Sequence, residues 1–468
     1  HAGVPKPKDS DERPQVKDPG NPPNHVSGIQ PERHVSAMLD AKDKSVGELK
    51  ALGFTAAHVV PHGKMLPGHG AVVLLGGESG EDMVLRDATS LFAQFKGSGG
   101  RYFPSTDMAI VAKWRELYAR ARQTQDHAKK YASNPRGMSR PTYSDVVASF
   151  HPVLDGKLPV FFHVDGIRDI HKALGLADEL GFPLVLTGTG RAQLAMDRIK
   201  AAKTPLFLDL DLPEAKDKKD AKSDEEKDEK TVAEATAASL EKRRAAAMAA
   251  FESQAAMLAK AGMDFGFTTV DVKAKDIRAN LGRMIKAGLT EDQALAALTT
   301  NPAKMLGLDA MLGTVEKGKI ANLVVTDKPY FAEKSNVRYV FVDGMPEEYK
   351  VKKKKKKSGG DAEAGVNALG SWTLNIDAPV ETPPATLTVT GEGTDLEATF
   401  GGMGGEDIEV NSLELDGDEL TFNVTVNFGG ESIVLSYDLT IDGDDIEGSV
   451  GAGNYGTFDV EGSRKDPE

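Results

Sequence analysis

The chain is 468 residues long, which is enough for two or three domains that each bury a core. Hydrophobic residues make up 40% of it and charged residues 27%, as in ordinary globular proteins. No apolar run approaches the roughly 20 residues that a membrane-spanning helix needs. The formal charge of -14 argues against nucleic acid as a partner, and the lack of cysteine excludes disulfides and Cys-ligated metal sites. Any metal would therefore be bound by His, Asp, Glu or a modified Lys.

The N-terminal region predicts an irregular lead-in, which we assign to residues 1–44. Its first 30 residues are rich in Pro, Lys and Asp and have no periodic apolar pattern. They also lack the apolar segment of a secretory signal peptide. Because residue 1 is a histidine rather than an initiator methionine, we expect a processed or trimmed chain that could have lost a targeting segment. Export to the periplasm and residence in the cytoplasm both stay open.

From about residue 45, continuous apolar strands alternate with amphipathic helices. A first helix is expected with Ser45 as its N-cap and Gly53 at its end. Later strands are expected within residues 159–166, 183–190, 205–212 and 263–271. Strands that are apolar on both faces are typical of a parallel sheet covered by helices. Residues 45–310 therefore predict an α/β fold, either a barrel or a doubly wound sheet. A mobile, charged insertion at 214–245 interrupts it and is expected to become helical toward its Ala-rich end.

The C-terminal part of the chain predicts a linker and a separate β domain. A block of lysines and a Gly-containing stretch indicate a solvated linker in residues 351–369. Residues 370–468 alternate apolar and polar side chains between turn sequences, as in an antiparallel β-barrel or sandwich. The Gly370-Ser371-Trp372 start and the late Arg464 resemble lipocalin-like barrels, in which the Arg stacks on the Trp. The alternative is a small accessory module with a packed interior.

The most informative segment runs from Ala287 to Pro346. It begins AGLTEDQALAALTTNPAKMLGLDAMLGTVEKGKIANLVVTD and ends VRYVFVDGMP. This segment closely resembles the C-terminal signature of the amidohydrolase superfamily, especially its imidazolonepropionase-like and dihydroorotase-like members. The resemblance implies a (β/α)8 TIM-type barrel with part of a flanking β-sandwich in residues 311–350. It also implies that the first barrel strand and half of the sandwich precede residue 1, as a cleaved segment that stays bound or as part of another chain.

The resemblance also implies a metal site at the C-terminal end of the barrel, holding one or two divalent ions such as zinc, manganese or iron. It assigns His163 as the strand 5 ligand, Asp271 as the strand 8 ligand and catalytic acid/base, and His1 as one member of a His-x-His pair. Thr187 and Gly188 stand where a strand 6 histidine is expected, and neither can replace an imidazole ligand. The alternatives are a hydrogen-bonded core histidine at His163 and a helix N-cap at Asp271.

A second group of histidines, His58, His62 and His69, is close together in sequence and could also bind a metal, although prolines interrupt its spacing. Three functions stay open. The first is a metal-dependent hydrolase that cleaves amide or cyclic amide C–N bonds, other than peptide bonds, in a small molecule. The second is a catalytically degenerate homologue, with or without a bound metal, acting as a structural or regulatory subunit beside an active paralogue. The third is a carrier whose C-terminal barrel binds an apolar ligand. A homo- or hetero-oligomer is expected, whereas the substrate cannot be read from the sequence.

Overall fold

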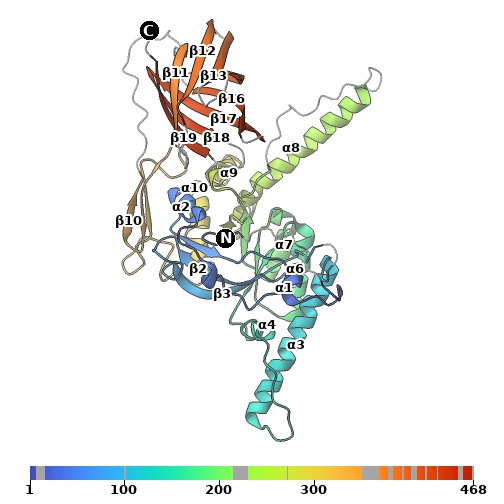
Figure 1. Cartoon of the computed structure of the whole chain (residues 1–468). Coiled ribbons are helices and arrows are strands. Elements are labelled where there is room, and N and C mark those ends of the chain that lie inside the picture. The colour runs from blue at the N-terminus through green and yellow to red at the C-terminus, as the bar shows by residue number, and fades with distance from the viewer. Residues whose placement is uncertain are drawn as a thin grey trace. The chain divides into compact units, whose positions relative to one another are not determined.

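The computed structural model describes residues 1–6, 16–99, 102–213, 230–270, 272–349, 368–377, 383–392, 395–401, 408–416, 419–428, 431–451 and 457–465. The chain forms two compact units, residues 1–352 and residues 353–468 (Figure 1). None of the helices in the described residues combines the length and apolar character that crossing a bilayer requires.

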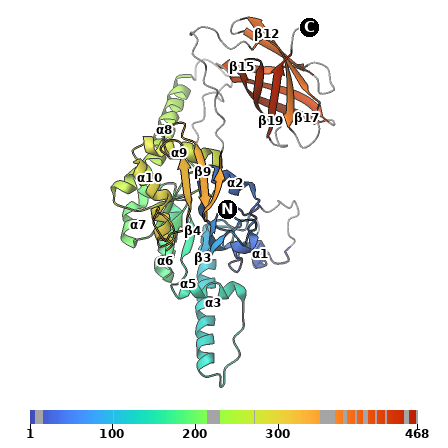
Figure 2. The same ribbon diagram turned by 90° about the vertical axis from the view of Figure 1, so that its left-hand side faces the viewer.

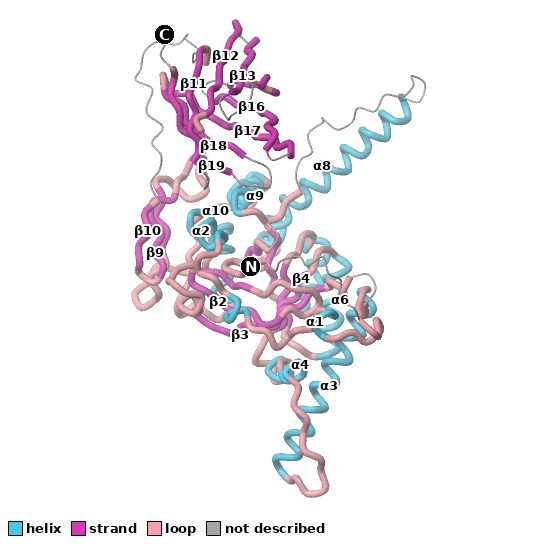
Figure 3. Tube along the Cα trace, in the orientation of Figure 1, coloured by secondary structure: helices cyan, strands magenta, loops and turns pink. Residues whose placement is uncertain are grey.

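A curled seven-stranded sheet forms the centre of the first unit (Figure 3). Its strands follow in chain order: β1 (Ala56–Val59), β2 (Gly68–Leu74), β3 (Val84–Gln94), β4 (Val160–His163), β5 (Leu184–Thr187), β6 (Leu206–Asp209) and β7 (Gly266–Thr268). The first three strands pair antiparallel, whereas β3 to β7 are parallel neighbours. The edges of the described sheet are therefore β1 and β7.

Several helices of the first unit pack on the outer face of this sheet. The described helices of this unit are α1 (Asn24–Ser27), α2 (Lys44–Ala51), α3 (Asp107–Ser133), α4 (Asp145–Ala148), α5 (His151–Leu154), α6 (Ile167–Leu180), α7 (Met196–Ala202), α8 (Lys230–Lys260), α9 (Ala274–Lys286), α10 (Glu291–Leu298) and α11 (Thr300–Met305), with short 3-10 helices η1 (Val35–Met38) and η2 (Ala192–Ala195). Trp114 of α3, Leu174 of α6 and Leu281 of α9 are buried in the core between helices and sheet. The distal half of α3 continues beyond this core (Figure 2).

Side chains of the parallel strands alternate between this outer core and the inside of the curled sheet. Phe162 belongs to the outer core under the helices. Phe161 and Phe207 instead belong to a separate inner cluster. His163, two residues after Phe161, has the same parity and therefore lies on the inner side of the sheet at the carboxyl end of β4. The same alternation places Thr187 on the inner side at the end of β5.

The predicted α/β barrel-type fold with part of a flanking sandwich is confirmed. After the barrel strands, a small antiparallel sheet contains β8 (Leu323–Thr326), β9 (Val337–Val342) and β10 (Met345–Glu348). The expected N-cap of the first helix is wrong, because the backbone N–H of Ser45 donates to the Asp43 carboxylate at 2.9 Å and α2 begins at Lys44. Gly53 follows this helix with a φ of 93°, a left-handed conformation that favours glycine.

The second unit is a single antiparallel sheet, as predicted. Its strands are β11 (Gly370–Asp377), β12 (Ala385–Glu392), β13 (Asp395–Gly401), β14 (Ile408–Glu409), β15 (Asn411–Asp416), β16 (Glu419–Phe428), β17 (Glu431–Asp442), β18 (Asp445–Gly451) and β19 (Thr457–Arg464). The two ends of the sheet approach each other where β13 contacts β15 and β14 contacts β16, so the barrel is nearly closed. The guanidinium of Arg464 lies 4.2 Å from the ring centroid of Trp372, which confirms the expected stacking.

Candidate functional site

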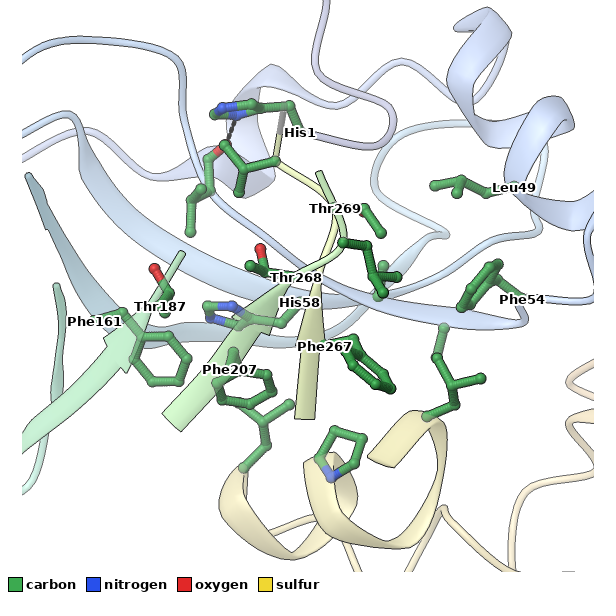
Figure 4. Close-up of a pocket in the computed structure, with 18 of the residues that line it drawn as sticks. His1, Leu49, Phe54, His58, Phe161, Thr187, Phe207, Phe267, Thr268 and Thr269 are labelled. Atoms are coloured by element: carbon green, nitrogen blue, oxygen red, sulfur yellow. Dashed lines mark hydrogen bonds between the residues drawn. The ribbon is translucent and has the colours of Figure 1, made fainter. Parts of the chain in front are cut away.

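A cavity of about 170 Å³ lies in the first unit, lined by residues of both edge strands and of the inner face of the sheet (Figure 4). Much of its wall is aromatic and comes from Phe54, Phe92, Phe161, Phe207 and Phe267. Its polar side chains are His1, His58, Thr187, Thr268 and Thr269. Among the described residues, no Asp, Glu, Lys or Arg side chain lines it. The cavity is therefore apolar, with a few polar groups that could orient a ligand.

A buried histidine is connected to this cavity through Thr187. His163 ends β4, and its Nδ1 lies 3.5 Å from Oγ1 of Thr187, which ends β5 and lines the cavity. Its other ring nitrogen, Nε2, lies 3.3 Å from Oδ1 of Asp165. We assign the proton to Nε2, because a carboxylate can only accept a hydrogen bond. Nδ1, on the Thr187 side, is then the nitrogen that can accept a proton.

Asp165 gives this histidine a defined electrostatic partner. The hydrogen bond from His163 is the main reason why the pKa of Asp165 lies below its ordinary value, although desolvation acts in the opposite direction. An ionised carboxylate beside an imidazole stabilises the imidazolium that forms when the ring takes a proton. Sequence reasoning does not single out Asp165, although the His-Val-Asp order at 163–165 is a visible signal.

The backbone of Gly188 lies against the imidazole ring of His163. Its φ is 74°, and a Cβ atom at this position would lie 2.3 Å from Cε1 and 2.5 Å from Nδ1 of His163. The imidazole of His163 therefore occupies the space that a side chain at position 188 would need. This explains in steric terms why a second histidine could not stand at this position without moving His163.

His58 is a second histidine of the site, and it comes from β1. Its ring stacks on Phe161 with a centroid distance of 4.5 Å, and its Nε2 lies 3.1 Å from Oγ of Ser90. Burial lowers the pKa of His58 to about 3, so the imidazole is neutral near pH 7. A neutral ring can both donate and accept one hydrogen bond, which suits it to contact an uncharged ligand.

The remaining predicted histidines do not converge on one point. His1 lines the cavity, where its Nδ1 donates to the carbonyl of Val60 at 2.7 Å and its ring stacks on His62 at 3.7 Å. His69 instead stacks on His34, with a centroid distance of 4.6 Å. The sequence cluster of His58, His62 and His69 thus divides between three different surroundings, because neighbours along a turning chain point in different directions.

The described side chains do not fit the expected metal site. Within the part of the chain that the structure describes, no group of three or more His, Asp or Glu side chains is arranged to bind a metal ion. His1 and His163 both lie in the region of the cavity, one lining it and the other contacting Thr187. Asp271, the third predicted ligand and the predicted acid/base, lies outside the described residues. We therefore assign no reaction step to a metal.

The first unit has an α/β barrel-type fold with polar side chains at the carboxyl ends of its parallel strands. Enzymes with such barrels carry their active sites at this end. Residues 216–346 match the model of the amidohydrolase family. This part of the chain is thus similar to the amidohydrolase family, in agreement with the resemblance that the sequence indicated. No curated protein sequence matches the chain.

A solved structure supports the same fold. The chain is similar to an amidohydrolase from Thermotoga maritima MSB8, with a TM-score of 0.56 and 22% sequence identity over 68% of this chain and 78% of that one. At this identity, the likeness shows the fold alone. A Xaa-Pro dipeptidase with bound methionine in its active site gives a TM-score of 0.30 and 17% identity over 46% of this chain and 51% of that one. That score is too low to support any conclusion.

Proposed function

We propose that the first unit hydrolyses the C–N bond of a small amide or cyclic amide at this cavity. The observation that carries the proposal is the His163–Asp165 pair, which lies at the carboxyl end of β4 and reaches the cavity through Thr187. Enzymes with barrel folds carry their reactive groups at this end of the strands. The match of residues 216–346 to the amidohydrolase family supports the same class of reaction.

The proposed reaction uses the two nitrogens of His163 in different roles. The substrate packs against the phenylalanines of the wall, and a water molecule attacks its carbonyl carbon. Nδ1 of His163 takes a proton from this water, while Asp165 on the opposite nitrogen stabilises the imidazolium. The proton then passes to the leaving nitrogen as the C–N bond breaks, so water is consumed and an acid and an amine are formed. The Thr187 hydroxyl, next to Nδ1, orients the water or the ring.

Dependence on a divalent metal is a separate prediction that comes from the superfamily. Zinc, manganese or iron would supply a Lewis acid and a more acidic bound water. His1 and His163 are the two predicted ligands that the structure describes, and a stable site needs more than two. Elemental analysis of the purified protein, with and without prior chelation, measures whether a metal binds.

Two substitutions test the catalytic pair in an assay of neutral anilides and lactams. We expect His163→Gln to lower kcat at least a hundredfold, since it removes the base but keeps a polar side chain. Asp165→Asn should lower kcat about threefold to tenfold and shift the lower limb of the pH–rate profile, because the imidazolium loses a carboxylate that is largely exposed and partly screened by water. Asp178→Asn, at an exposed position of α6, is the matched control and should behave like the parent chain. Unchanged turnover in His163→Gln would refute the proposed role.

A catalytically degenerate homologue is the second candidate function. Two observations favour it: His163 fills the space beside Gly188, and the described residues contain no three-ligand metal group. In this case the chain would be a structural or regulatory subunit that assembles with an active amidohydrolase paralogue. Absence of turnover with every tested amide, together with co-purification of a defined second polypeptide, would support this candidate. Turnover by the isolated chain at a normal enzymatic rate would exclude it.

A further inference from the structure

We infer that the cavity selects an uncharged molecule the size of one six-membered ring that carries a carbonyl or amide group. This substrate class rests on the proposed function, because it describes the ligand of the same site. The inference goes beyond the proposed reaction, because an amide hydrolase could equally act on charged or much larger substrates. Three properties of the cavity lead to this inference. They are its volume, the uncharged side chains that the described residues place along it, and its aromatic and imidazole walls.

The volume sets the size of the ligand. An engineered apolar cavity of about 150 Å³ in another protein binds benzene. The cavity inside the first unit measures about 170 Å³. It therefore holds one six-membered ring with a small substituent, whereas the second ring of a fused pair would lie partly outside it.

The described side chains of the lining offer a charged ligand no ion pair. None of the described Asp, Glu, Lys or Arg side chains lines the cavity, so a bound carboxylate or ammonium group would have no side chain of opposite charge. Transfer of an unpaired ion from water into such surroundings is strongly unfavourable.

The walls are arranged to hold a ring and one polar group. The rings of Phe161, Phe207 and Phe267 lie close to His58, and the side chain of His1 lies on the opposite side of the cavity (Figure 4). Aromatic side chains favour offset or edge contacts with another ring. His58 is held in place by the buried Ser90, whose Oγ lies 3.1 Å from its Nε2, and by its contact with the ring of Phe161. A held imidazole can therefore recognise a carbonyl or amide in one orientation.

Three related compounds test size and charge in a binding experiment with the full chain. Isothermal titration calorimetry at pH 7 compares benzamide with its 4-carboxylate and with 2-naphthamide, which has two fused rings. We expect benzamide to bind at least a hundredfold more tightly than the carboxylate and at least tenfold more tightly than the naphthamide. Equal or tighter binding of the carboxylate or the naphthamide, or no binding of benzamide, would overturn the inference.

A pair of neighbouring alanines in α10 provides a matched test of location. Ala297 lines the cavity, whereas Ala296 does not. Ala297→Leu should fill part of the space and weaken benzamide binding at least tenfold, whereas Ala296→Leu should change it less than twofold. Circular dichroism checks that both variants fold. If Ala297→Leu does not fold, Ala57→Val tests a second position of the lining, on β1. Equal effects of the two leucine variants, or no weakening by Ala57→Val, would place the ligand elsewhere.

Binding and turnover separate this inference from the proposed function. Benzamide that binds as expected but is never hydrolysed, in a chain without turnover of any amide, would contradict the function and leave the ligand class intact. Hydrolysis of a charged amide by a chain that does not bind benzamide would contradict the ligand class and leave the function intact.

Discussion

Substitution of Gly188 by alanine tests how the structure holds His163. The φ of 74° at Gly188 is left-handed, which costs an alanine about 1 kcal/mol. The new Cβ atom would also lie 2.3 Å from Cε1 of His163, so the buried ring must move. Overpacking of this kind costs about 1–3 kcal/mol. We therefore expect Gly188→Ala to lower the free energy of unfolding by about 2–4 kcal/mol.

Gly181 provides a control with the same backbone conformation. Its φ is 79°, and a Cβ atom there would meet nothing within 4 Å. Gly181→Ala should therefore lower the free energy of unfolding by only about 1 kcal/mol. The difference between the two variants isolates the contact with His163.

The assay is unfolding in guanidinium chloride, followed by the fluorescence of Trp114 in a Trp372→Phe background so that the signal comes from the first unit. Imidazole NMR resonances of His163 provide a second readout, which should shift in Gly188→Ala and not in Gly181→Ala. Equal losses of stability in the two variants, with an unmoved His163 resonance, would refute the packing argument.

Two further predictions concern buried histidines and the closure of the second unit. Burial lowers the pKa of His58 to about 3 and the pKa of His69 to about 4, whereas the pKa of each is near 6.5 in the unfolded chain. The stability that comes from keeping these two rings neutral is therefore complete above pH 6.5, and it is lost as the pH falls toward the folded values. The free energy of unfolding should thus be about 2 kcal/mol lower per histidine at pH 5 than at pH 7. If a double His58→Gln, His69→Gln variant keeps the same dependence of stability on pH, these histidines are not its cause. In the second unit, Arg464→Met should cost about 1 kcal/mol by removing the cation from the face of Trp372; unchanged Trp372 fluorescence and unfolding midpoint would show that the stacking contributes nothing.

The sequence by itself determined the class of the fold and the place of its strands. Apolar runs followed by amphipathic helices are local patterns, and they located β4, β5, β6 and β7 within the predicted ranges. The segment from Ala287 to Pro346 identified the superfamily through its order and spacing, and the family match over 216–346 agrees with it. Period-two alternation likewise located the separate β domain, because the alternation reflects which face of a strand is buried.

Only the tertiary structure decided which side chains meet at the site. His163 was identified from the sequence, but its contact with Thr187 depends on the register of β4 against β5, which pairs residues 24 positions apart. The contacts of His163 with Asp165 and Gly188 depend on the direction in which the chain turns after each strand. The periodicity of the sequence does not encode that direction. The same reason explains why His58 enters the cavity while His62 and His69, close to it in sequence, stack on other histidines. Local patterns thus fix the elements, whereas register and turn geometry fix the chemistry.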